Sequence, residues 1–323
     1  MPIPSLNEEK GIPVPEWNLS PAALKKAQQD FRASAPDRRT VHTRARSEAR
    51  KTAVSKTHAG ATAELNPLVS FKLSDLLLDR KKLELWSKVF LRKRKNQKDM
   101  TATEWAAFIN AINTLATPGA QTPTFQEFVG IHVQSMDPNN HAAHGWGVHT
   151  MAGHSGFNFL AWHREYLAKL EARLRLVNPL VVIPYWDWIN DRAIPPQLSA
   201  PSDLRAWGIT RRRTFTPDSL PTKSDIDLVM GRTNFADFQS ALEGPHGWVH
   251  NAVGGTMATS SSPADPIFWL HHAMVDKIWA DWQRTHTTAA SRPTNLNETL
   301  QPPPIITRKV SQVLNTSSLG YSY

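Results

Sequence analysis

Histidine is the residue type in this chain whose positions could do chemistry, because imidazole nitrogens bind metal ions. Eleven of the thirteen histidines lie between His132 and His286. The six that we select as candidate ligands form two groups, which are His132, His154 and His163, then His246, His250 and His272. Two sites of three imidazoles each would hold a pair of metal ions.

The spacing of the second group has a geometric reason. His246 and His250 are four residues apart, so on a helix their Cβ atoms stand on one face, about 5 to 6 Å apart. Their ring nitrogens can then share one ion at about 2 Å, and His272 is the natural third ligand. Imidazole suits zinc, copper, iron and nickel, and an all-imidazole set favours copper, although the spacing alone leaves zinc open.

Helices are the elements that must position these rings. Phe125, Phe128 and His132 share one helical stripe, and apolar residues recur on one face of residues 163–176. Asp265-Pro266 opens a helix that runs through Trp282. Helices that carry inward-facing ligands around a metal pair form a bundle, so we expect a mainly α fold with few short strands and long loops.

Other segments have weaker signals. Ser20-Pro21 predicts a short helix, with serine as its cap and proline in its first turn. Thr101 and Glu104 form a capping box that opens another. Residues 74–95 suggest an amphipathic helix, residues 181–183 a strand and residues 191–225 a proline-rich loop.

Two stretches resemble the signatures of a known family. The stretch from His154 to Leu167, which includes Trp162-His163-Arg164, resembles the copper A signature of the tyrosinase, catechol oxidase and hemocyanin superfamily. The stretch from Pro245 to Trp279 resembles its copper B signature. The resemblance implies copper A ligands at His132, His154 and His163, and copper B ligands at His246, His250 and His272. His271 would be a neighbour of the site. It also implies two copper ions, with O2 as cosubstrate.

Some positions in this assignment rest on further reasoning. We prefer His132 over the loop residues His141, His144 and His149, because a helical stripe holds an imidazole rigidly. Asp276 and Asp187 are the carboxylates expected to orient ligand rings. Asp187 could equally pair with Arg164.

The function implied by the resemblance is oxidation of o-diphenols or o-aminophenols to o-quinones, with o-hydroxylation of monophenols as a further activity. In tyrosinases a glutamate and an asparagine near copper B are proposed to hold a water that deprotonates the phenol. Glu243 resembles that glutamate. Gly247 occupies the asparagine position, which leaves Asn251 as the candidate.

Two other classes of function stay open from the sequence. A hemocyanin-like protein would bind O2 reversibly, with little turnover because a residue blocks its site. A zinc hydrolase, or a basic binding module with a degenerate metal site, is the third class. The intact ligand set and the lack of a carboxylate ligand speak against that third class.

Charge divides the chain into a basic extension, residues 1–90, and a catalytic domain, residues 91–323. Residues 1–100 carry 21 Lys and Arg against 11 Asp and Glu, whereas residues 101–323 carry 16 against 17. We expect the extension to be partly extended or disordered. Its basic runs favour a solvated segment, or one that bridges a homo-oligomer, over nucleic-acid binding, because aromatic residues do not interleave with the charges.

The composition excludes several classes. The chain has no cysteine, so it has no disulfides and no thiolate ligands for copper. No apolar run approaches the roughly 20 residues of a membrane span. The first residues lack a signal-peptide pattern, so we expect cytoplasmic residence. Some family members are kept latent by a carboxy-terminal lid or a plugging aromatic. Here we expect gating from the extension or a partner, and we expect residues 1–90 to wrap the domain or mediate oligomers.

Overall fold

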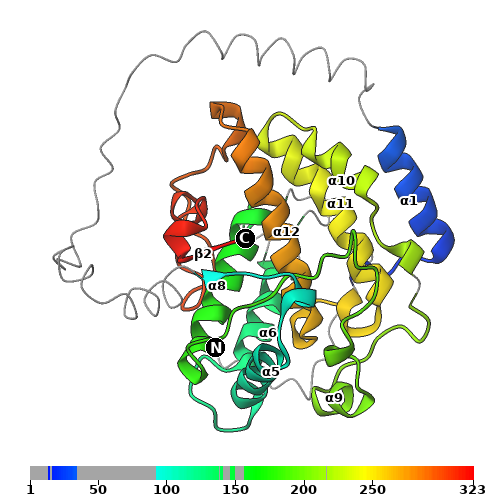
Figure 1. Ribbon diagram of the computed structural model, residues 1–323. Coiled ribbons are helices and arrows are strands. Elements are labelled where there is room, and N and C mark those ends of the chain that lie inside the picture. Colours follow the sequence, from blue (N-terminus) through cyan, green and yellow to red (C-terminus); the bar gives the residue numbers. More distant parts are fainter. Residues whose placement is uncertain are drawn as a thin grey trace.

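The computed structural model describes residues 14, 17–34, 92–137, 139–140, 146–149, 156–215 and 217–323 (Figure 1). Four of its helices carry histidines of the two groups, and they are α6 (Phe125–Ser135), α8 (Phe159–Val177), α11 (Phe235–Val253) and α12 (Ile267–Thr285). Helix α8 packs against α12, α11 and α5 (Ala102–Ala116), and α5 also packs on α6. The expectation of a mainly α bundle is confirmed.

Shorter elements complete the described chain. The remaining α-helices are α1 (Pro21–Ala33), α9 (Pro201–Ala206) and α10 (Lys223–Met230). Single 3-10 turns occur at η2 (Gln97–Asp99), η3 (Pro196–Leu198), η4 (Pro217–Ser219), η5 (Gly255–Ala258), η6 (Ser262–Ala264), η7 (Ala289–Ser291), η8 (Val310–Val313) and η9 (Ser317–Leu319). Strands β1 (Arg92–Lys93) and β2 (Tyr321–Ser322) pair in parallel, with Arg92 opposite Tyr321.

Helix starts follow the predicted caps. The Ser20 side chain accepts a hydrogen bond from the Ala23 amide, with Pro21 in the first turn of α1. Thr101 and Glu104 form the expected capping box of α5. Each cap satisfies amide groups that the first turn of a helix leaves without an intrahelical partner. These local signals placed both helices correctly.

The core is rich in aromatic side chains between α8 and α12. Trp162, Trp269, Trp279 and Trp282 are all buried. Three of these indoles also donate to backbone carbonyls outside their own helices, for example Trp282 to Arg232 at 2.8 Å. A buried indole N–H that keeps its hydrogen bond adds apolar area without an unsatisfied donor. This packing makes a rigid base for the histidines.

Three expectations about local structure are wrong. Residues 181–183 form no strand, and the Ile183 amide donates to the Glu171 carboxylate at 3.1 Å instead of to a sheet partner. Residues 191–225 contain α9 and the start of α10 as well as loop. The helix expected at 74–95 does not extend to residue 95, because Arg92–Lys93 is a strand. Residues 74–91 lie outside the described residues.

The basic run at 92–95 has a structural use. Arg94 is fully buried, with its guanidinium 3.0 Å from Glu171 and 3.3 Å from Asp276. Arg92 lies 3.3 Å from the other oxygen of Glu171. The two arginines are therefore neither a nucleic-acid surface nor solvated. The other basic run, at 38–51, lies outside the described residues.

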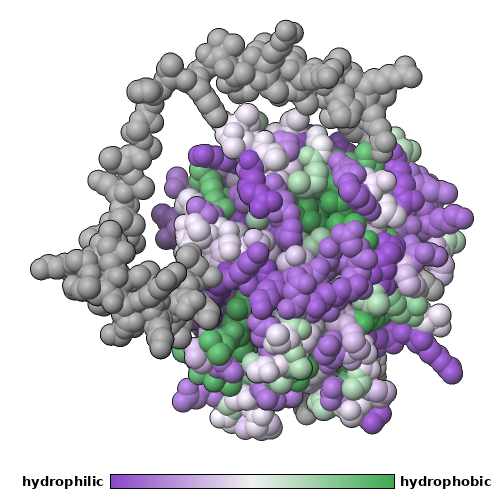
Figure 2. Space-filling model, viewed as in Figure 1, coloured by the Kyte–Doolittle hydropathy of each residue, from purple (hydrophilic) through white to green (hydrophobic). Residues whose placement is uncertain are grey.

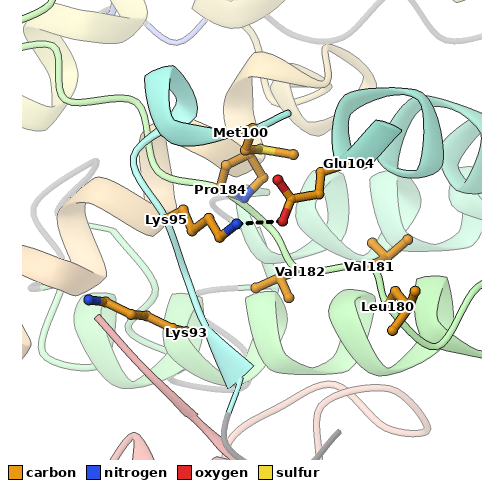
Figure 3. Close-up of a pocket in the computed structure, with 8 residues that line it drawn as sticks. All are labelled: Lys93, Lys95, Met100, Glu104, Leu180, Val181, Val182 and Pro184. Atoms are coloured by element: carbon orange, nitrogen blue, oxygen red, sulfur yellow. Dashed lines mark hydrogen bonds and ion pairs between the residues drawn. The ribbon is translucent and has the colours of Figure 1, made fainter. Parts of the chain in front are cut away.

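The surface adds two observations. The face in Figure 2 is largely hydrophilic, with apolar side chains in small separate patches. A pocket between β1 and α5 is crossed by the 2.5 Å ion pair of Lys95 with Glu104 and flanked by Leu180 and Pro184 (Figure 3), and none of its lining residues is a histidine. Among the described helices, none combines the length and apolar character needed to cross a bilayer.

Candidate metal centre

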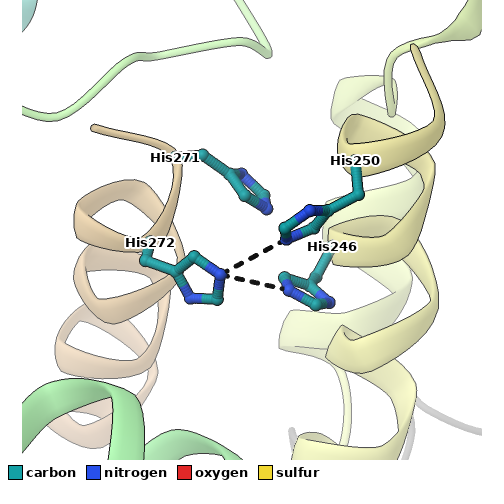
Figure 4. Close-up of side chains that lie close together, drawn as sticks. All are labelled: His246, His250, His271 and His272. Atoms are coloured by element: carbon teal, nitrogen blue, oxygen red, sulfur yellow. Dashed lines mark hydrogen bonds between the residues drawn. The ribbon is translucent and has the colours of Figure 1, made fainter. Parts of the chain in front are cut away.

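Histidines from α11 and α12 meet face to face. His246 and His250 point from α11 toward His271 and His272 on α12, and the four rings occupy the space between the two helices (Figure 4). The Nε2 atom of His272 lies 3.3 Å from that of His246 and 3.4 Å from that of His250. The four-residue spacing on α11 therefore has the consequence that the sequence predicted.

These distances fit a bound ion. Two nitrogens that bind one ion at about 2.0 Å with tetrahedral angles are about 3.3 Å apart. Each neutral imidazole has a single N–H, so three converging Nε2 atoms cannot all be satisfied by one another. An ion among them would use all three lone pairs.

A second group contains His132, His149 and His163. Candidate ligand atoms of these three residues all lie within 4.8 Å of one another. His132 comes from α6 and His163 from α8, whereas His149 lies in residues 146–149 between them. His149 was not among the predicted ligands, because a loop residue has no periodicity to mark it. His154, which was predicted, lies outside the described residues, as do His141 and His144.

The two groups are in contact. The rings of His163 and His272 are stacked, with centroids 4.1 Å apart and an interplanar angle of 11°. His149 and His246 are also stacked, at 5.4 Å and 19°. Ions held by the two groups would therefore be neighbours, close enough to share one small ligand.

Backbone carbonyls orient the rings. The Nδ1 atom of His132 lies 2.7 Å from the carbonyl oxygen of Ser260, and that of His250 lies 2.6 Å from that of Met257. His163 uses the Phe159 carbonyl of its own helix, at 2.9 Å. A ring that donates through Nδ1 presents Nε2 for metal binding. Asp276 and Asp187 were expected in this role, and the structure assigns neither to a ligand ring.

Residues 255–264, which we call the connector, supply carbonyls to one ring of each group. The connector joins α11 to α12 and contains η5 and η6. Gly255 has a φ of 57°, and a Cβ there would lie 2.3 Å from the Thr210 carbonyl oxygen. No other residue fits this approach, so the glycine fixes the path of the connector.

Burial keeps the imidazoles neutral. His132, His246, His250 and His272 are all 0% exposed. Burial lowers the pKa of His132 from 6.5 to about 4. Burial likewise lowers the pKa of His163, His246, His250 and His272 well below 6.5, and nearby histidines lower it further. A neutral imidazole has the free lone pair that a metal requires.

Several ring nitrogens point to a missing partner. Among the described residues, the Nε2 atoms of His132 and His163 have no hydrogen-bond partner although both are buried. An unsatisfied polar atom is costly in a protein interior, and a metal ion would satisfy both atoms.

The family signature in residues 122–216 and 202–285 is described as the common central domain of tyrosinase. The chain belongs to the tyrosinase family.

Individual relatives agree with this assignment. Tyrosinase from Streptomyces antibioticus is 34% identical over 262 residues, which is 65% of this chain and 92% of the relative. Tyrosinase from Streptomyces lincolnensis is 36% identical over 262 residues, which is 65% of this chain and 91% of the relative. A functional unit of octopus hemocyanin has a similar fold, with a TM-score of 0.56 at 24% identity, over 72% of this chain and 68% of that unit.

Family membership identifies the chemistry in outline. The tyrosinase family has a pair of copper ions, and the two histidine groups suit such a pair. The chain is a copper-dependent phenol oxidase.

A buried charge network stands behind the histidines of this tyrosinase-family protein. Arg164 Nε lies 2.5 Å from one oxygen of Asp276, and the hydroxyls of Tyr321 and Tyr323 donate to the other at 2.6 Å. Burial alone would raise the pKa of Asp276, but Arg164 and Arg94 outweigh it and hold that pKa below its usual value. Asp276 thus anchors α12 one turn beyond His272.

The two candidate catalytic residues lie on α11 with different contacts. The Glu243 carboxylate is 3.6 Å from Nδ1 of His149, and its side chain is 15% exposed. The Asn251 side chain is buried and donates to the Leu19 carbonyl at 3.0 Å. Asn251 therefore contacts the segment that precedes α1, and no sequence pattern indicated this contact.

Proposed function

We propose that this protein oxidises o-diphenols to o-quinones with O2, using two adjacent copper ions. The observation that carries the proposal is the contact between the two histidine groups, in which His163 stacks on His272 at 4.1 Å. A diphenol loses two electrons and two protons on becoming a quinone, and two such turnovers reduce one O2 to two waters. Two adjacent metals let O2 take up electrons in pairs.

The geometry and the family signatures together support one assignment of the ligands. His246, His250 and His272 would hold one copper, and His132 and His163 would provide two ligands of the other. The third ligand of that second ion is either His149, whose candidate ligand atom lies within 4.8 Å of those of the other two, or His154, supported by its spacing. When bound, copper supplies the redox step, and the protein supplies position and a site that excludes water.

Proton transfer falls to Glu243 in this proposal. A phenol must lose its proton before it binds a metal as phenolate, and a carboxylate at the edge of the site can accept that proton. Glu243 is close enough to His149 to belong to this edge. Asn251 spends one amide N–H on the Leu19 carbonyl, which leaves its second N–H and its oxygen as groups that could hold a water. We therefore propose o-diphenol or o-aminophenol oxidation as the main activity, with monophenol hydroxylation as a second one.

A reversible O2 carrier is the alternative. Units of the hemocyanin of the octopus Enteroctopus dofleini are 35% identical over 156 residues, which is 39% of this chain and 13% of that protein. Such a carrier would bind O2 but would turn over phenols poorly. The two functions differ in one measurable property, which is the rate of quinone formation in a protein that binds O2.

The test is a comparison of substrates on the copper-loaded protein. We expect two coppers per chain, an O2-dependent absorption band, and quinone formation from 4-methylcatechol and o-aminophenol, with slower formation from tyrosine. O2 binding without quinone from any of these compounds would support the carrier. Loss of the band in His272→Gln would assign it to this site.

Other expectations remain proposals. A small phenol and O2 are the partners that the proposed function requires. A homo-oligomer formed through residues 1–90, the lack of a nucleic-acid partner and cytoplasmic residence each need a separate measurement. Most of residues 1–90 lie outside the described residues.

A further inference from the structure

One aromatic side chain from the extension reaches the candidate metal centre. The indole of Trp17 is stacked on the imidazole of His250, with centroids 3.9 Å apart and an interplanar angle of 16°. Its centroid lies 5.4 Å from that of His246 and 6.4 Å from that of His132, so one indole contacts both histidine groups. Trp17 is 4% exposed. Its side chain is therefore as buried as those of the core residues.

The position of this indole is one that an aromatic substrate needs. A phenol whose oxygen reaches a metal held by these imidazoles would place its ring in the space beside them. Trp17 already fills the face of His250 with a flat ring larger than that of a phenol. A substrate and this indole cannot occupy the same space.

Backbone contacts hold Trp17 in place. The Val14 amide donates to the Ala258 carbonyl of the connector at 3.0 Å, and the Trp17 amide donates to the Val14 carbonyl at 2.9 Å. On the other side, Asn251 donates to the Leu19 carbonyl at 3.0 Å. The segment thus binds the connector and α11, the two elements that also hold His250. When it leaves, the Asn251 amide is released as well.

Helix α1 fastens this segment to the outside of the domain, beside α10 and α11 (Figure 1). Arg32 makes two hydrogen bonds to the Asp225 carboxylate, at 2.6 and 2.9 Å. Phe31 packs edge-on against Trp248, with centroids 5.3 Å apart. The Arg32 side chain is 44% exposed, whereas Asp225 is buried and also accepts hydrogen bonds from the amide and the hydroxyl of Thr222. Asp225 keeps its Thr222 partners when Arg32 leaves, so we infer that α1 can be released without unfolding the domain.

We propose that the segment formed by Val14 and residues 17–33 is autoinhibitory, with Trp17 as an internal occupant of the phenol-binding position. This inference rests on the proposed function, because it concerns access to the same site. The segment blocks the aromatic substrate while the smaller O2 still reaches the metals. Cleavage or displacement of the segment activates the enzyme.

The experiment compares two variants with two matched controls. Trp17→Ala removes the blocking ring, and Arg32→Ala weakens the attachment of α1 without touching the site. Lys26→Ala is the control for Arg32→Ala, because Lys26 is on the same helix and pairs only with Asp30 among the described residues. Trp207→Ala is the control for Trp17→Ala, because Trp207 follows α9 and donates to Asn113.

Two readouts separate this inference from the proposed function. The first is binding of benzoate, which cannot form a quinone, to the zinc-loaded proteins by calorimetry. The second is kcat/KM for 4-methylcatechol in the copper-loaded proteins. We expect Trp17→Ala to improve both at least tenfold and Arg32→Ala to improve both severalfold. Both controls should match the parent.

The outcomes are distinct. Unchanged benzoate binding in both Trp17→Ala and Arg32→Ala overturns the autoinhibitory segment, whatever the oxidase activity. Improved benzoate binding without quinone formation from 4-methylcatechol supports the segment and contradicts the proposed oxidase. If Trp17→Ala fails to fold, Arg32→Ala alone decides, because its side chain lies outside the core.

Discussion

Arg164 and Asp276 form an ion pair that is enclosed between α8 and α12, with the guanidinium also lying 3.5 Å above the ring of Trp279. Asp276→Asn would leave the charges of Arg164 and Arg94 buried without their shared anion. Breaking one side of a buried pair costs about 3 to 5 kcal/mol of unfolding free energy. We expect a loss of this size in urea unfolding. Asp187→Asn is the control, because the Asp187 carboxylate accepts hydrogen bonds from the amide and the side chain of Asn190 in an exposed turn.

Copper counting should decide between the two candidates for the third ligand near His132. If His149 is the ligand, His149→Gln lowers the copper content from two ions per chain to about one, because two imidazoles bind the ion much more weakly than three. His154→Gln then keeps both ions. The reverse pattern would favour His154 and remove His149 from the ligand set. Atomic absorption on the purified, dialysed proteins measures the difference.

Gly255 should be far more sensitive to alanine than another left-handed glycine. Gly119 has a φ of 80° with open space around it, so Gly119→Ala costs only the backbone strain, about 1 kcal/mol. Gly255→Ala adds a clash with the Thr210 carbonyl, and we expect about 2 to 4 kcal/mol. It should also weaken metal binding, because the connector carbonyls orient His132 and His250. Equal effects of the two substitutions would contradict this account.

The metal-free protein should lose stability as the pH falls below 6.5. Buried histidines have a lowered pKa in the folded state, so the unfolded chain takes up protons first. For His132 the contribution is lost between pH 6.5 and about 4, the pKa that burial gives it. The stabilisation that Asp276 contributes, with its pKa held below 3.8, is lost only at still lower pH. Urea unfolding at several pH values measures the slope, and His132→Gln should flatten it.

Glu243→Gln should separate the two phenol activities. The amide keeps the size of the side chain but cannot accept a proton at neutral pH. We expect hydroxylation of tyrosine to fall about 100-fold or more, as is typical for loss of a general base, and oxidation of 4-methylcatechol to change little. Parallel loss of both activities would instead mean that Glu243 positions His149. The copper content of the variant serves as the control.

Patterns along one helix made much of the site predictable. The spacing of His246 and His250, and the stripe that ends at His132, indicated which side chains face inward, because helical period fixes direction. His149 carried no such signal, since it lies between helices. Local sequence was also insufficient at residues 181–183. This β-branched run was expected to pair with a strand, but the Ile183 amide donates to the Glu171 carboxylate.

Backbone partners were beyond prediction for a different reason. Every residue has a carbonyl, so no residue type marks Met257 or Ser260 as the atom that orients a ring. The approach of Trp17 was equally hidden, because its contact with His250 joins distant parts of the chain. We expected Asp276 to orient a ligand ring because carboxylates often do so, but it pairs with Arg94 and Arg164 instead.

The connector has a consequence for how the protein acquires its metals. Because Met257 and Ser260 lie three positions apart on one short stretch, ordering either carbonyl orders the other. An ion bound by one group restrains its ring and, through the connector, the ring of the other group, so we expect the second ion to lose less entropy on binding than the first. Loading should be positively cooperative, so that half-filled molecules are scarce at every copper concentration.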